Sequence, residues 1–129
     1  MTIAEYLEAI KDRLLTDPLI TDLDVLRERS TSTDGHMRVR LTLDDHSQLE
    51  FSEYVQRSVA GQTNTITYSY HWSDAQGHLI RRWDNTPHFP ALAGFPHHVH
   101  IGPADTVAPS QPVNILSVLD IIGQLIHPA

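Results

Sequence analysis

The segment ITYSYHWSDAQGHLIRRW, residues 66–83, decides the fold because it contains two β-strand patterns and the turn that joins them. In its first half, apolar side chains alternate with small or polar ones, which is typical of a strand with one buried face. The apolar positions are Ile66, Tyr68, Tyr70 and Trp72. His71 falls on the opposite face. The SDAQG turn has a common hairpin length, so the segment predicts an antiparallel hairpin with one apolar and one polar face.

The period of two continues upstream of the hairpin. Residues 37–43 alternate cleanly, residues 49–55 carry a return strand after a turn, and residues 23–29 are a further candidate strand. Glu53 falls on the apolar face of its strand, and an edge position or a β-bulge would explain it. Consecutive strands joined by short turns indicate an antiparallel meander.

A helix is predicted at each end of the chain. Residues 3–15 have apolar side chains at helical spacing, preceded by a capping box of Thr2 and Glu5. Asn114 is a good N-cap for a final helix that is apolar on more than one side. Such a helix is either deeply buried or shared with a partner, which is compatible with a homodimer.

Between the hairpin and the final helix, residues 84–96 are irregular and residues 97–101 form one more short strand, followed by a proline-spaced loop. The 129 residues have the size of one domain. We therefore predict a single α+β domain over residues 1–129. It consists of an N-terminal helix, a five- to six-stranded antiparallel meander sheet and a C-terminal helix.

The composition narrows the classes of function. The chain has no cysteine, which excludes disulfides and thiolate metal sites. It carries neither a transmembrane segment nor a signal peptide, so the expected location is cytoplasmic. Nine basic and sixteen acidic residues give a net charge of −7, which argues against a general nucleic-acid coat protein. A small local basic pocket remains compatible with this charge, and so does a basic protein partner.

Histidines mark the expected site. Six of the nine lie between residues 68 and 102, together with both tryptophans and two adjacent arginines. Histidine exchanges protons near neutral pH and offers metals a neutral nitrogen, so this density indicates a functional site. The six are His71, His78, His88, His97, His98 and His100.

Several motifs of this region resemble a known family. They are Y-x-Y-H-W, D-x-x-G-x-L-I-R-R-W-D-N, P-H and F-P-H-H-V-H, followed by a V-L-D-I-I helix. Their order resembles the TumE-type toxins of bacterial toxin–antitoxin pairs, over most of the chain. The resemblance implies a small cytoplasmic protein that inhibits growth, encoded beside an antitoxin with a DNA-binding helix-turn-helix domain. It also implies cleavage of RNA or a block of translation.

Metal-independent RNA cleavage needs a base for the 2′-hydroxyl, an acid for the leaving 5′-oxygen and a cation for the phosphate. His98 and His100 share one face of a strand and are candidates for the acid–base pair. Arg82 or Arg81 is a candidate for the cation. If the two hairpin strands pair, His71 approaches Arg82 on the same sheet face.

Aromatic side chains near these residues are candidates for substrate binding, because single-stranded RNA is commonly recognised by stacking. The candidates are Tyr68, Tyr70 and Trp83, with Arg81 as a charged contact. Arg82 and Asp84 have two interpretations. They can form an ion pair that only orders the following turn, or Asp84 can aim the guanidinium at an anion.

Two other interpretations of the histidines stay open. No cofactor is expected, but zinc or nickel is compatible with the sequence, since His98 and His100 at i, i+2 resemble a ligand pair. His88, His71 or Asp84 would complete that site. Alternatively, the histidines bond to the backbone and have no role in catalysis. The second functional hypothesis is therefore a non-catalytic module that binds protein or metal through a histidine and aromatic face.

Overall fold

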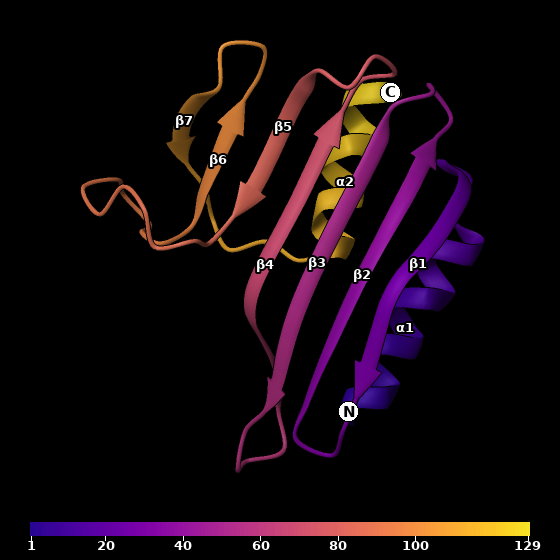
Figure 1. The fold of residues 1–129 in the computed structure, drawn as a ribbon, viewed down its shortest axis with the longest axis vertical. Helices are drawn as coiled ribbons and strands as arrows, with labels where there is room; N and C mark the ends of the chain where they lie inside the picture. The colour runs from indigo at the N-terminus through magenta and orange to yellow at the C-terminus, as the bar shows by residue number, and fades with distance from the viewer.

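In the computed structural model, which describes residues 1–129, seven strands form one antiparallel sheet and two helices cover one of its faces (Figure 1). The strands lie in the sheet in chain order, so the predicted α+β class and meander are confirmed. Neither helix has the length and hydrophobicity that crossing a bilayer requires. The elements are α1 (Ile3–Thr16), β1 (Ile20–Ser30), β2 (Asp34–Leu43), β3 (Gln48–Arg57), β4 (Thr63–Ser73), β5 (Leu79–Asp84), β6 (His98–Ile101), β7 (Thr106–Pro109) and α2 (Ile115–Ile126).

The capping box predicted for α1 is present. Thr2 Oγ1 accepts a hydrogen bond from the Glu5 backbone N–H at 3.1 Å, and Glu5 Oε1 accepts one from the Thr2 N–H at 2.9 Å. The apolar stripe of α1 is buried in the core: Ile3, Leu7, Ile10 and Leu14. The capping box therefore sets the N-terminus of α1, and the apolar residues at helical spacing are the ones that pack into the core.

The final helix, α2, also has the predicted N-cap, because the Asn114 side chain accepts from the Ser117 N–H at 2.9 Å. Its buried residues are Ile115, Val118, Leu119 and Ile122. Leu116 and Leu125 remain exposed. The helix is thus buried along one stripe and keeps two leucines in contact with solvent.

The sheet has one strand more than the sequence predicts. β7 lies in the segment for which the sequence indicates only a proline-spaced loop. It pairs with β6, with Ala108 opposite Val99 and Val107 opposite His100. A four-residue strand that ends in Pro109 is tolerated here because β7 is the edge of the sheet. Such a short strand gives too few alternating positions to be recognised.

Of the two explanations expected for Glu53, the edge position is wrong, whereas a bulge is present between Tyr54 and Val55. Glu53 lies in the third of seven strands and is completely buried. Its carboxylate accepts hydrogen bonds from the hydroxyl groups of Tyr6 and Tyr70 and from the backbone N–H of Ile115 at 3.0 Å. One side chain therefore connects α1, the sheet and the N-terminus of α2, where a negative charge is favourable.

Two buried tyrosines, Tyr68 and Tyr70, and the partly buried Tyr6 make stability sensitive to alkaline pH. Burial raises the pKa of Tyr68 to about 12 from 10.0, and burial together with the charge of Glu53 raises the pKa of Tyr6 and Tyr70. Above pH 10 the unfolded chain loses these protons before the folded chain does, so the free energy of unfolding should fall. Urea unfolding at about pH 9 and about pH 11 measures this. Equal free energies at both values would contradict the expectation.

Candidate functional site

The face of the sheet opposite the helices carries polar side chains in two adjacent rows that cross β2 to β6. In each row, every residue is paired with its neighbour on the next strand. The first row is Arg40, Glu50, His71, Arg82 and His100. The second row is Arg38, Ser52, Ser69, Asp84 and His98. Paired side chains in an antiparallel sheet start about 4.5–5.5 Å apart, so the register places residues distant in sequence in one site.

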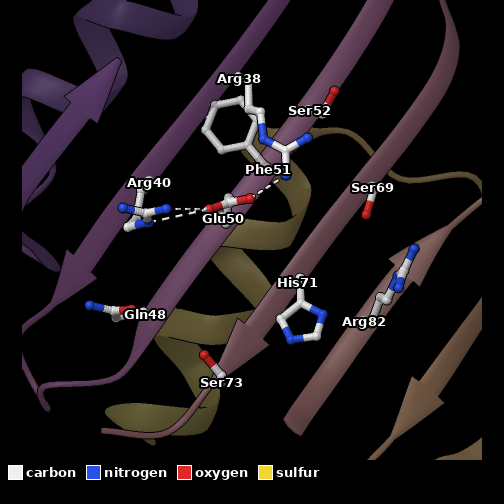
Figure 2. A pocket seen from close by; sticks show the side chains of 10 residues that line it. All are labelled: Arg38, Arg40, Gln48, Glu50, Phe51, Ser52, Ser69, His71, Ser73 and Arg82. Atoms are coloured by element: carbon white, nitrogen blue, oxygen red, sulfur yellow. Dashed lines mark hydrogen bonds and ion pairs between the residues drawn. The ribbon is translucent and has the colours of Figure 1, made fainter. Parts of the chain in front are cut away.

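An open depression of about 670 Å³ lies over this face (Figure 2). Its lining contains three arginines and one glutamate, which give it a formal charge of +2, although the chain as a whole carries −7. The sequence permitted a small local basic pocket, and the structure contains one. The lining residues are Arg38, Arg40, Gln48, Glu50, Phe51, Ser52, Ser69, His71, Ser73 and Arg82.

Glu50 holds two of these arginines in place. Its carboxylate accepts a hydrogen bond from Arg38 and, at 3.0 Å, from Arg40 Nη2 (Figure 2). Partial burial opposes the charge of Glu50, but these hydrogen bonds outweigh it and lower the pKa of the carboxyl group. The ionised Glu50 therefore orients two half-exposed guanidinium groups at the edge of the depression.

His71 lies in the middle of the first row, between Glu50 and Arg82. Burial, and then the positive charge of Arg82, lower the pKa of His71 below its ordinary value of 6.5. The imidazole is therefore neutral at pH 7 and has a free nitrogen that can accept a proton.

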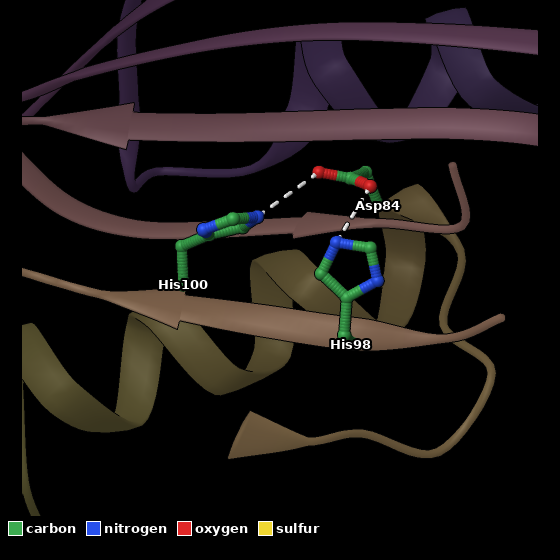
Figure 3. A group of neighbouring side chains, drawn as sticks. All are labelled: Asp84, His98 and His100. Atoms are coloured by element: carbon green, nitrogen blue, oxygen red, sulfur yellow. Dashed lines mark ion pairs between the residues drawn. The ribbon is translucent and has the colours of Figure 1, made fainter. Parts of the chain in front are cut away.

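Asp84, His98 and His100 form a tight cluster beside the depression (Figure 3). Asp84 is buried, and its Oδ1 lies 3.0 Å from His98 Nε2. Its Oδ2 lies 3.7 Å from His100 Nε2 and 3.1 Å from Arg82 Nε. The ion pair between Arg82 and Asp84 that the sequence suggested is therefore present, and the carboxylate aims the guanidinium along the first row.

The four residues expected to be catalytic all lie on this face: His71, Arg82, His98 and His100. They differ in accessibility. The His98 ring is 1% exposed and lies beneath the surface of the site, whereas Arg82 is exposed.

The residues expected to bind substrate are placed differently, and that prediction is wrong for the aromatic ones. They are buried in the core on the helix-covered face and cannot stack on a base: Tyr68, Tyr70 and Trp83. Arg81 pairs with the buried Trp72 and so also lies away from the open face. His88 is exposed in the loop before β6 and is not part of the cluster of Asp84, His98 and His100, whose atoms are close enough to hold a metal ion.

Several residues of the site were not singled out from the sequence, among them Arg38, Arg40, Glu50 and Phe89. Arg38 and Arg40 were available from their strand pattern, because they occupy the polar face of residues 37–43. Phe89 carried no such signal, since it lies in an irregular loop. It has a left-handed backbone with φ of 60°, and its ring lies 5.3 Å from that of His98 and 6.1 Å from that of His100. It is 43% exposed, so it is an aromatic side chain next to the site that can reach a ligand.

The fold and the site define an α+β protein with two helices on one face of a meander sheet and a positively charged, histidine-containing site on the other. The family described as toxin TumE matches residues 8–126, so the chain belongs to the TumE toxin family. It is thus the toxin of a toxin–antitoxin system, and its family implies a cognate antitoxin. Comparisons with curated proteins and with solved structures give no significant match.

Proposed function

We propose that this toxin inhibits growth by cleaving single-stranded RNA on the open face of the sheet. The observation that carries the proposal is the row His71, Arg82, His100, in which three groups suited to phosphodiester chemistry occupy neighbouring strands. Two of the three, His71 and Arg82, line the arginine-rich depression in a chain whose net charge is −7.

His71 is the proposed general base. It is neutral at pH 7 and can take the proton of a ribose 2′-hydroxyl, whose oxygen then attacks the adjacent phosphorus. A new bond from the 2′-oxygen to phosphorus forms as the bond to the 5′-oxygen breaks. The products are a 2′,3′-cyclic phosphate and a fragment with a 5′-hydroxyl.

Arg82 is the proposed cation for the scissile phosphate. Its position between His71 and His100 in the row puts it at the centre of the reacting group, and its ion pair with Asp84 fixes its direction. A pre-oriented cation stabilises the charge that develops in the transition state. The leaving 5′-oxygen then lies on the side of His100, and in this proposal it takes a proton from solvent water to become the 5′-hydroxyl.

The remaining arginines and Phe89 bind the rest of the RNA in this proposal. Arg38 and Arg40 contact neighbouring phosphates through guanidinium groups that Glu50 orients. Phe89 replaces the buried aromatic residues as the side chain on which a base stacks, because it is exposed and adjacent to His100.

Arg40→Ala should weaken the binding of single-stranded RNA and reduce the slope of log affinity against log salt by roughly 0.7 for the phosphate contact that is lost. Fluorescence anisotropy at several salt concentrations measures both. The matched control is Arg57→Ala, an arginine at the end of β3 outside the depression. An equal loss in the Arg57 variant would show that charge alone, and not this face, binds RNA.

Induced expression in bacteria without the antitoxin tests the function in cells. Wild type and His78→Ala should arrest growth, because the His78 side chain is 75% exposed and outside the rows. Arg82→Ala and His71→Ala should permit growth at equal protein levels. Arrest by all four proteins would place toxicity elsewhere and would favour a non-catalytic binding module.

The cognate antitoxin is proposed to be a helix-turn-helix protein, as the resemblance implies. Co-expression and co-purification with the product of the neighbouring gene test this. A stable complex with a protein that lacks such a domain would contradict it.

A further inference from the structure

We infer that Asp84, His98 and His100 bind one Zn²⁺ ion at the end of the two rows. The three ligand atoms come from neighbouring strands β5 and β6 and lie within 4.8 Å of one another (Figure 3). Nothing in the proposed RNA-binding role requires such an ion, so the inference depends on the geometry of these side chains.

The hydrogen bonding of His98 indicates a missing cation. Its Nδ1 lies 2.9 Å from the carbonyl oxygen of Pro96, which can only accept, so Nδ1 carries the proton. In the neutral ring, Nε2 then presents a lone pair to Asp84 Oδ1, 3.0 Å away, which is also an acceptor. The Nε2 atom is buried and has no hydrogen-bond partner. Two buried acceptors facing each other are unfavourable unless a cation lies between them.

His100 has the same arrangement. Its Nδ1 lies 2.7 Å from Asp105 Oδ1, and its Nε2 faces Asp84 Oδ2 at 3.7 Å. Histidines that bind metal usually donate their second ring N–H to a carbonyl or a carboxylate, which fixes the tautomer and aims the other nitrogen. Both histidines satisfy this requirement, one through Pro96 and the other through Asp105.

Protons alone are a poorer solution than a metal ion. If each Nε2 carried a proton, two imidazolium rings with centroids 5.0 Å apart would share Asp84 with the Arg82 guanidinium. That gives three positive charges against the two carboxylates of Asp84 and Asp105. One Zn²⁺ with neutral rings carries the same total of three positive charges, counting Arg82, but it bonds to both nitrogens directly and removes the repulsion between two charged rings.

The ligand set favours zinc over magnesium. Zn²⁺ binds imidazole nitrogen and carboxylate oxygen at about 2.0–2.2 Å, so two ligand atoms on one ion are roughly 3–4 Å apart. The separations of 3.0 Å from Asp84 Oδ1 to His98 Nε2 and of 3.7 Å from Asp84 Oδ2 to His100 Nε2 agree with this for a carboxylate that binds through both oxygens. Magnesium prefers oxygen ligands and seldom takes imidazole. Three protein ligands leave a fourth position open, and the ring of Phe89 provides an apolar wall beside it.

The role of the ion rests on the proposed function. His100 ends the row on the side where the leaving 5′-oxygen is expected, so an ion held there can stabilise the charge on that oxygen as a Lewis acid. Binding of the ion itself does not depend on RNA cleavage, and the two can be measured separately.

Titration of chelator-treated, untagged protein with Zn²⁺ alone tests the site. Calorimetry should give one ion per chain for wild type, and excess Mg²⁺ should not displace it. Asp84→Asn and His100→Gln should abolish stoichiometric binding. Asp105→Asn should weaken it by about 10- to 100-fold, because Asp105 only orients His100. Asp105 is exposed, so this variant tests the site without disturbing the core.

Asp44→Asn is the matched control for Asp105→Asn. Asp44 also pairs with a histidine at 2.7 Å, but that histidine, His127, is exposed and lies outside the cluster. Zinc binding should be unchanged in this variant. Absence of binding to wild type, or equal binding by the Asp84 and His100 variants, would overturn the inference. Stoichiometric binding without RNA cleavage would support the zinc site and refute the proposed function, whereas RNA cleavage by a wild-type protein that binds no Zn²⁺ would do the reverse.

Discussion

Glu53→Ala is expected to lower the free energy of unfolding by about 3–5 kcal/mol, a large part of the stability of a domain of this size. The substitution removes the acceptor of two buried donors, the Tyr70 hydroxyl and the Ile115 N–H, and of the partly buried Tyr6 hydroxyl, which keeps Thr65 Oγ1 at 3.5 Å. Each unsatisfied buried group costs about 1–3 kcal/mol, and the cavity adds to this cost. Urea unfolding monitored by circular dichroism measures the loss.

Tyr70→Phe is the control for the Glu53 substitution. It removes one donor, retains the ring, and leaves the Glu53 carboxylate bound by Tyr6 and Ile115, so the expected loss is about 1–2 kcal/mol. If Glu53→Ala unfolded at the same urea concentration as wild type, the carboxylate would not be the connection between helices and sheet that its contacts indicate.

His71→Ala is expected to reduce the rate of RNA cleavage by about 10²- to 10⁴-fold, the usual contribution of a general base. Burial and the charge of Arg82 lower the pKa of His71 below its ordinary value of 6.5, so the wild-type rate should fall to half its maximum only below that pH. The variant should lose this acidic limb of the pH profile, which a merely structural role would not explain. Single-turnover cleavage of a labelled RNA over a pH series gives both results.

The control for His71 is His78→Ala, which removes an exposed histidine that pairs with Asp74 in the hairpin turn. Its rate and pH profile should match those of wild type. A His71 variant that keeps the wild-type rate and acidic limb would mean that the base is another group.

The alternation of side chains was enough to predict the meander and the polar face. His71 and the apolar positions of β4 alternate in the sequence, and the structure places them on opposite faces. The same alternation places Tyr68 and Tyr70 on the face opposite His71, so they cannot stack on a ligand that His71 contacts. It also placed Arg38 and Arg40 on the polar side of their strand, although nothing in one strand reveals that this side shares a sheet face with His71, two strands away.

Other parts of the site depend on the register between β5 and β6. A long loop joins these strands, and the local sequence does not specify how they pair. Asp84 and His98 pair directly, but 13 residues separate them, and the proline-rich segment between gives no pattern from which the pairing follows. Phe89 reaches the histidines only through the path of that loop. Glu53 was noticed as an anomaly, but its partners lie on two helices and a neighbouring strand, and their meeting is a property of the packed fold.

The chemistry of the cut ends provides the most direct measurement. Purified toxin is incubated with a synthetic single-stranded RNA, and the fragments are identified by mass spectrometry. Attack by a 2′-hydroxyl activated by His71 should give 2′,3′-cyclic phosphate and 5′-hydroxyl ends. It should also fail at a position that carries a 2′-deoxyribose. Cleavage at the deoxyribose position, or fragments that His71→Ala and Arg82→Ala produce as fast as wild type, would show that the rows on the open face are not the catalytic site.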